Sequence, residues 1–215
     1  MCFKDFIFDK NVLLLGPASY MQENKINPNF DDYDTIIKLN KMVEKNYYYS
    51  NFNNDRCDVL YHCLDINIPN GDLPYKINTW VNSGVKHVRI THPPVTSYYK
   101  NNLERFYYLN KDKNMKNSCV GIQDFISIVN RSNTSPNAGT IAIYDILQNN
   151  PKSLSIKGIT FCKTPYTNGY KESVFDKNKK SQHNPDKQIL FFKSLLKEYK
   201  NIIQIDEQLE RIIYE

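Results

Sequence analysis

Three short segments of this chain carry side chains suited to chemistry on an anionic ligand. The first follows the apolar run Val12 to Leu15 and consists of four residues: Gly16, Pro17, Ala18 and Ser19. A glycine here lets the backbone approach a ligand, and a helix that starts after it offers free amide donors to an anion. The segment lacks both the GxGxxG dinucleotide pattern and the GKS/T of a P-loop. A turn between a strand and a helix, with no ligand, explains it equally well.

The second segment precedes an apolar stretch and runs from Ser135 to Thr140. Short hydroxyl and amide side chains beside a glycine are typical of a helix N-terminus, where unpaired N–H groups and the helix dipole attract a phosphate or carboxylate. The residues that we expect to face such a group are Asn137, Ala138, Gly139 and Thr140. A plain N-cap without a ligand is the alternative interpretation.

The third segment holds His183, in a polar stretch just ahead of a predicted helix. A histidine with an ordinary pKa of about 6.5 can act as a general base near neutral pH. A surface histidine without a function is the commoner case. The other three histidines, His62, His87 and His92, are too scattered along the sequence to indicate a metal site.

Buried strands and amphipathic helices alternate along the chain. Apolar runs predict strands at 12–15, 35–39, 57–62, 85–90, 154–161 and 202–205, and periodic apolar positions predict helices at 97–109, 121–129, 139–148 and 185–199, with a final helix after them. This order predicts one α/β domain over residues 1–215, with a doubly wound, mostly parallel, Rossmann-like sheet and helices on both faces. Ligands bind at the carboxyl ends of such strands. We therefore expect 16–19, Asn40, His62 and 162–166 on one rim.

Composition excludes several classes of protein. The 215 residues are 40% hydrophobic and 24% charged with a formal net charge of +5, and the lysines are spread out, which argues against a nucleic-acid partner. No apolar run reaches the length of a membrane span, and we expect no anchor or signal in this soluble sequence. The five cysteines are odd in number and contain no CxxC pair, so we expect reduced thiols in the cytoplasm or another reducing compartment. Oligomeric state is open.

The order of the segments resembles the sialyl motifs of glycosyltransferase family 29. Residues 12–18, followed by the acidic residues and the strand of 32–40, are similar to the family's long motif, which ends in a nucleotide-binding asparagine. Residues 136–142 look like its short motif, which binds the donor. His183 and Gln188 are placed like the His and the acid of its very short motif.

This resemblance implies a metal-independent, inverting glycosyltransferase that needs no cofactor. The expected partners are a CMP-linked sugar, sialic acid or a relative of it, and an acceptor hydroxyl on a glycan or another molecule. His183 would take the proton of that hydroxyl. Tyr170, in a faint counterpart of the family's third motif, would steady the leaving phosphate, and the other donor-binding residues would be those of the first two segments together with Asn40. The fold would be a sialyltransferase variant of the GT-A type.

The sequence also departs from the family pattern. Pro17 stands where the family carries an asparagine, Gln188 stands where it carries a glutamate, and the cysteines of its disulfide between motifs are absent. Asp32-Tyr33-Asp34 matches the DxD metal pattern, but we interpret these acids as turn and cap residues. Two alternatives stay open: a nucleotide-binding module without catalysis, and another doubly wound transferase such as a methyltransferase.

Overall fold

The chain alternates strands and helices, as its apolar pattern predicts. The computed structural model describes residues 2–24, 28–43, 56–64, 76–167, 170 and 183–214. Its strands are β1 (Asn11–Leu15), β2 (Thr35–Leu39), β3 (Val59–His62), β4 (His87–Ile90), β5 (Lys116–Cys119), β6 (Ser153–Lys157) and β7 (Ile203–Ile205). Its α-helices are α1 (Tyr20–Glu23), α2 (Ile77–Asn82), α3 (Ser97–Asn110), α4 (Ile122–Ser132), α5 (Ala138–Gln148), α6 (Pro185–Glu198) and α7 (Glu207–Tyr214). Short 3₁₀ helices are η1 (Phe3–Phe6), η2 (Phe30–Asp32) and η3 (Asn40–Val43).

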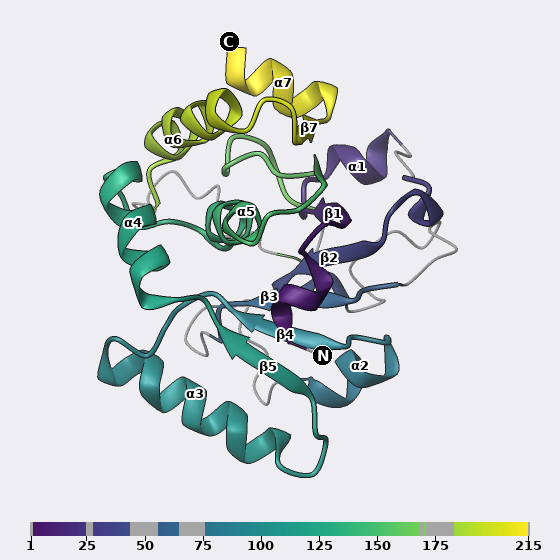
Figure 1. The fold of residues 1–215 in the computed structure, drawn as a ribbon, viewed down its shortest axis with the longest axis vertical. Coiled ribbons are helices and arrows are strands. Elements are labelled where there is room, and N and C mark those ends of the chain that lie inside the picture. Colours follow the sequence, from purple (N-terminus) through teal and green to yellow (C-terminus); the bar gives the residue numbers. More distant parts are fainter. Residues whose placement is uncertain are drawn as a thin grey trace.

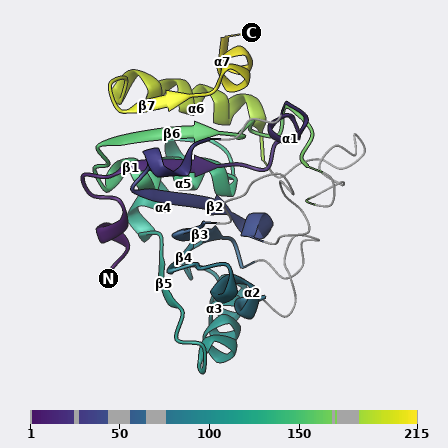
Figure 2. The same ribbon diagram turned by 90° about the vertical axis from the view of Figure 1, so that its right-hand side faces the viewer.

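The described strands form one parallel sheet in the order β5-β4-β3-β2-β1-β6-β7 (Figures 1 and 2). The order of connections reverses at β1, which is the arrangement of a doubly wound sheet. All five residues of β2 and four of the five in β1 are buried, because helices cover both faces of the sheet. The predicted fold class is therefore confirmed. The prediction of a single domain over 1–215 stays a prediction.

Two apolar clusters pack against opposite faces of strand β3. On β3, Leu60 packs with Trp80 of α2 and Phe106 of α3, whereas its neighbour Tyr61 belongs to the core that holds α5 and α6. Adjacent residues of a strand point to opposite faces, so this alternation places α2 and α3 on one side and α5 and α6 on the other. Figure 1 shows α3 and α2 at the bottom of the view and α5 and α6 above them.

The carboxyl edge of the sheet brings together the ends of strands and the start of α5. Gly16 follows β1, Asn40 follows β2 and Gly158 follows β6. The start of α5 lies at this edge too, because the Cβ position of Gly139 would be 3.5 Å from Cγ2 of Ile159, just after β6. The predicted rim of 16–19, Asn40 and His62 is therefore formed by the ends of neighbouring strands.

Some predicted boundaries are wrong. The strand expected to continue to Phe161 ends at Lys157, because Gly158, Phe161 and Cys162 all have positive φ angles, between 49° and 73°, that no strand accommodates. The short helix α2 and the edge strand β5 had no counterpart in the predicted elements. None of the helices in the described ranges has the length and apolar character that crossing a bilayer requires.

A buried polar network joins α5 to strands β3, β4 and β5. The Arg89 guanidinium donates to both carboxylate oxygens of Asp145, at 2.8 Å each, and Tyr61 donates its hydroxyl to the same carboxylate at 2.7 Å. Ser118 links Arg89 to His87, with both side-chain contacts at 2.8 Å. Phe3 of η1 covers the Arg89 guanidinium, which lies 4.2 Å from the ring centroid. The N-terminal 3₁₀ helix thus seals the network from solvent.

His87 makes the stability of the protein depend on pH. Burial, and then the charge of Arg89, lower the pKa of His87 from 6.5 to about 4. The unfolded chain therefore holds more protons than the folded one between about pH 4 and 6.5, and the free energy of unfolding rises with pH across that window. We expect it to be lower by about 3 kcal/mol at the acidic end, at about 1.4 kcal/mol for each unit of pKa difference.

The measurement is chemical denaturation of the wild type and of His87→Gln across this pH range. The variant keeps a polar partner for Ser118 but does not titrate, and the other histidines are common to both proteins. The slope of stability against pH should be clearly smaller in the variant. Equal slopes would show that His87 is not the group that takes up the proton.

Candidate functional site

The N-terminus of α5 presents two open amides at the carboxyl edge of the sheet. Asn137 caps the helix, with its side chain accepting from the Thr140 amide at 2.9 Å. Within the described part of the chain, the amides of Ala138 and Gly139 have no acceptor. The first turn also contains no acidic residue. Free N–H groups and the positive end of an 11-residue helix together form a receptor for an anion.

The start of α6 is bound to the segment that leads into α5. Lys187 Nζ donates to the Asn133 carbonyl at 2.9 Å, and the Asn184 amide donates to Thr134 Oγ1 at 3.2 Å. Gln188, which is fully buried, accepts from the Asn137 amide at 3.1 Å. These contacts join residues about fifty positions apart in sequence, so they hold the first turn of α6 beside the first turn of α5.

His183 lies in this junction with a defined tautomer. Its Nδ1 is 2.9 Å from the carbonyl oxygen of Ser135. A carbonyl only accepts hydrogen bonds, so Nδ1 carries the proton and, in the neutral ring, Nε2 has the lone pair. The imidazole is half-buried. The structure therefore places the His183 ring beside the segment that leads into α5, and its role as a general base stays a prediction.

Asn40 and Tyr170 form a second part of the rim. Asn40 is buried with φ at +45°, accepts from the Cys63 amide at 3.0 Å and donates to the Tyr170 hydroxyl at 3.4 Å. Burial raises the pKa of Tyr170 well above its ordinary value, so the phenol keeps its proton and can donate it in a hydrogen bond. Tyr170 also contacts Tyr166, with ring centroids 5.3 Å apart.

The turn from Gly16 to Ser19 does not offer the free amides that we expected. The amides of Gly16, Ala18 and Ser19 donate to the carbonyls of Lys157, Gly158 and Pro165, and Pro17 has no N–H. The helix that follows, α1, has only four residues. We expected an anion receptor at this turn because its backbone amides would be free. That reason was wrong, because carbonyl groups of β6 and of the segment after it accept hydrogen bonds from these amides. A donor-binding role for these four residues stays a prediction.

Gly16 has a packing role instead. A Cβ atom at Gly16 would lie 2.3 Å from the carbonyl oxygen of Gly158 and 2.5 Å from Cγ1 of Ile159. Only a glycine fits such an approach. Because Ile159 also lies beside Gly139, it joins the turn after β1 to the start of α5. The Ile159 side chain, in the turn after β6, therefore lies between the first two sequence segments, the turn at Gly16 and the start of α5.

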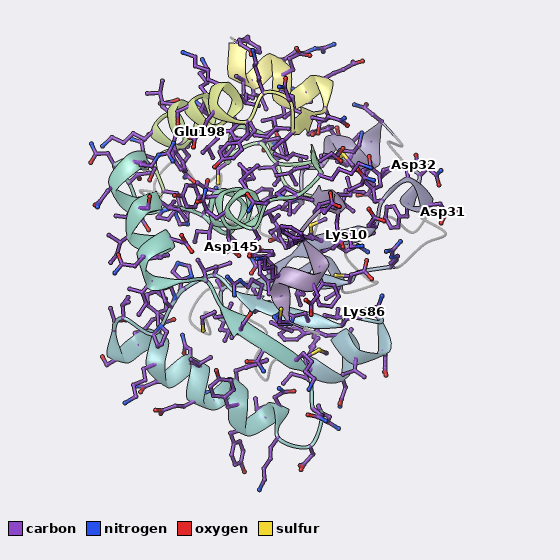
Figure 3. The ribbon with its side chains drawn as sticks, viewed as in Figure 1. Lys10, Asp31, Asp32, Lys86, Asp145 and Glu198 are labelled. Atoms are coloured by element: carbon purple, nitrogen blue, oxygen red, sulfur yellow. The ribbon has the colours of Figure 1, made fainter. Side chains whose placement is uncertain are left out.

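The acids of the DxD pattern lie at the opposite edge of the sheet. Asp34 precedes β2 and accepts from the Asn11 amide at 2.8 Å, and Asp32 accepts from the Asn29 side chain at 2.9 Å. Figure 3 shows Asp31 and Asp32 near the outer margin, well apart from Asp145 on α5. Asp32 makes a contact within the turn of η2, whereas Asp34 joins the start of β2 to the start of β1. Within the described ranges, no cluster of three His, Cys, Asp or Glu side chains could hold a metal ion.

Comparisons with known proteins find likeness in structure alone. The chain matches no protein-family profile and no curated protein sequence. It is similar to the sialyltransferase CstII of Campylobacter jejuni in complex with cytidine-5'-monophosphate (TM-score 0.59, 16% identity, 92% of this chain and 80% of that chain). It is also similar to the monofunctional alpha-2,3-sialyltransferase Cst-I of the same organism (TM-score 0.61, 13% identity, 92% and 75%).

The fold is that of these sialyltransferases. A further CstII structure, in complex with a trisaccharide acceptor and CMP, matches with a TM-score of 0.55 at 15% identity, covering 90% of this chain and 80% of that chain. These enzymes belong to glycosyltransferase family 42 and not to family 29, so the family 29 assignment from the motifs is not supported. At these identities the likeness concerns the fold and does not place the chain in either family.

Sequence reasoning did not foresee the contacts that join the first turn of α6 to the segment leading into α5. Gln188 was noted for its place in a motif, five residues after His183, but its contact with the Asn137 amide was not foreseen. Ile159 carries no signal of its own in the sequence. Lys171, considered beside Tyr170, lies outside the described residues.

Proposed function

We propose that this chain is an inverting glycosyltransferase that transfers sialic acid or a related sugar from a CMP-linked donor to an acceptor hydroxyl. The observation that carries the proposal is the contact of His183 Nδ1 with the Ser135 carbonyl, which fixes the tautomer of the ring beside the segment that leads to the open amides of Ala138 and Gly139. The likeness of the fold to sialyltransferases solved with CMP supports the identity of the donor.

The proposed reaction is a single displacement. The acceptor oxygen attacks the anomeric carbon while His183 takes its proton, the bond from that carbon to the phosphate oxygen breaks, and CMP leaves with the bonding electrons. The Ala138 and Gly139 amides and the α5 dipole would hold the charge that develops on the phosphate, and Tyr170 would donate a hydrogen bond to it. Asn40 would contact the nucleotide. No step requires a metal or a cofactor.

We also propose that the protein works in the cytoplasm or another reducing compartment. All five cysteines are free thiols in the structure, and Cys57 is fully buried. Burial raises the pKa of the Cys57 thiol to about 12, which keeps it protonated and unreactive. Thiols of this kind need no protection from oxidation inside such a compartment.

Calorimetric titration of the purified chain tests the proposal when it is combined with an assay of CMP release from CMP-sialic acid. We expect saturable binding of CMP, weaker binding of UMP and AMP, and release of CMP that increases when an acceptor glycan is added. Binding of CMP without release would favour a nucleotide-binding module instead. Binding of S-adenosylmethionine but not of CMP would favour a methyltransferase.

A further inference from the structure

Cys162 lies in a tight turn that holds its backbone in an unfavourable conformation. Phe161 and Cys162 have φ angles of +49° and +65°, in the left-handed region that residues other than glycine rarely adopt. The Lys163 amide closes the turn by donating to the Thr160 carbonyl at 2.8 Å. Phe161 is buried, with its ring centroid 5.3 Å from that of Phe192 in α6. The core therefore fixes the turn in place, and backbone strain of this kind often marks a functional position.

The Cys162 thiol contacts Tyr166, a residue that links two parts of the rim. Cys162 Sγ lies 3.1 Å from Tyr166 Oη, so one of these two groups donates a hydrogen bond to the other. The backbone of Tyr166 forms a bridge with Ala18, in the turn after β1. Its ring meets the ring of Tyr170 edge-on, at an interplanar angle of 75°, and Tyr170 contacts Asn40 after β2. Contacts thus run without a break from Cys162 to the ends of β1 and β2.

The Tyr166 side chain is fixed at both ends. The bridge to Ala18 fixes its backbone, and the Cys162 contact fixes its hydroxyl. Because an edge-to-face contact depends on how the two rings are turned, a Tyr166 ring that rotates would also shift the ring of Tyr170. Tyr170 is the phenol that would donate to the leaving phosphate in the proposed reaction. A displacement of about 1 Å in such a group can lower a rate by about 10²-fold.

We infer that Cys162 is a positioning residue of the proposed transferase: its thiol holds the Tyr166 ring and, through that ring, holds the Tyr170 phenol beside the leaving phosphate. This inference rests on the proposed function and goes beyond it, because the thiol itself contacts neither donor nor acceptor in the proposed reaction. A hydrogen bond that strengthens as charge develops on the phosphate acts on kcat more than on affinity. Loss of the thiol should therefore appear in kcat.

The test compares Cys162→Ala and Cys162→Ser with the wild type, by steady-state transfer kinetics and by calorimetric titration of CMP. Cys162→Ala removes the thiol and is expected to lower kcat about tenfold, with the CMP affinity within about twofold of the wild type. Cys162→Ser puts a hydroxyl in the place of the thiol. Because this hydroxyl can hydrogen-bond to Tyr166, kcat should return to within about threefold of the wild type.

A third variant separates the loss of the thiol from the strain of the backbone. Cys162→Gly also lacks the thiol, but a glycine adopts a φ angle of +65° without strain. It should melt at or above the temperature of Cys162→Ala and still lose as much kcat, a combination that a purely structural role would not give. The matched control is Cys119→Ala, which removes another half-buried thiol from the edge strand β5 and should transfer sugar at the wild-type rate.

Tyr170→Phe shows whether Cys162 acts through the phenol. This variant lacks the hydroxyl that would donate to the phosphate, and its kcat is expected to fall about 10²-fold. Adding Cys162→Ala to Tyr170→Phe should change kcat by less than about twofold, because the group that Cys162 positions is already missing.

Each outcome bears on the inference. A wild-type kcat in Cys162→Ala, Cys162→Gly or Tyr170→Phe would overturn it. It would also be overturned by a Cys162→Ser protein no more active than Cys162→Ala, or by a further tenfold loss when Cys162→Ala is added to Tyr170→Phe. In all these cases transfer by the wild type would leave the proposed function standing. A wild type that transfers no sugar would remove both the proposed function and this inference.

Discussion

Replacing His183 with alanine is expected to lower kcat for sugar transfer by about 10²- to 10⁴-fold, the usual contribution of a general base. The His183 ring is oriented by the Ser135 carbonyl, which places the lone pair on Nε2. Without it the acceptor hydroxyl has to lose its proton to water. Affinity for CMP should change little, because the open amides lie on Ala138 and Gly139. The measurement is a steady-state assay of transfer together with a CMP titration.

The matched control is Lys197→Ala, which changes an exposed residue of α6, the helix that follows His183. It should transfer sugar at the wild-type rate. A His183→Ala protein that keeps the wild-type kcat would show that His183 is not the base. Another group would then have to take the proton of the acceptor hydroxyl.

Replacing Asp145 with asparagine is expected to destabilise the protein by about 3 to 5 kcal/mol, which is typical when a buried ion pair loses one partner. Asp145 is fully buried and receives two hydrogen bonds from Arg89 and one from Tyr61. In the variant the Arg89 charge stays in the interior without a counterion. For a chain of this size we expect the melting temperature to fall by roughly 10 °C or more. Thermal unfolding by circular dichroism measures it.

The exposed pair between Arg131 and Glu198 offers the comparison. Its two atoms are 2.9 Å apart, close to the 2.8 Å of the buried pair, but the two side chains are 35% and 46% exposed. Glu198→Gln should therefore cost less than about 1 kcal/mol. If both variants lose the same stability, burial is not what gives the Asp145 pair its strength.

The sequence predicted those elements whose burial pattern is local. The run from Val12 to Leu15 and the strand Thr35–Leu39 are apolar almost throughout, because each lies between helices on both faces of the sheet. Strand β5, Lys116–Cys119, was missed because it lies at the edge of the sheet, where polar residues are tolerated. Its place in the sheet depends on pairing with β4, and no local pattern records that pairing.

The candidate site likewise combines features that a local sequence pattern predicts with contacts between distant residues that no local pattern predicts. Asn137 was predicted at the start of a helix and His183 ahead of one because caps and polar residues ahead of helices are local features. The closure of the turn after Gly16 was not foreseen, since the groups that occupy its amides come from Lys157, Gly158 and Pro165, about 140 residues away. The orientation of His183 likewise depends on Ser135, which lies in another part of the chain.

A crystal structure of the chain with CMP tests the central claim most directly. The account predicts the phosphate within hydrogen-bonding distance, about 3 Å, of the amides of Ala138 and Gly139, with Nε2 of His183 facing the side from which an acceptor would attack. CMP bound away from the α5 N-terminus, or a His183 ring turned away from the phosphate, would contradict it.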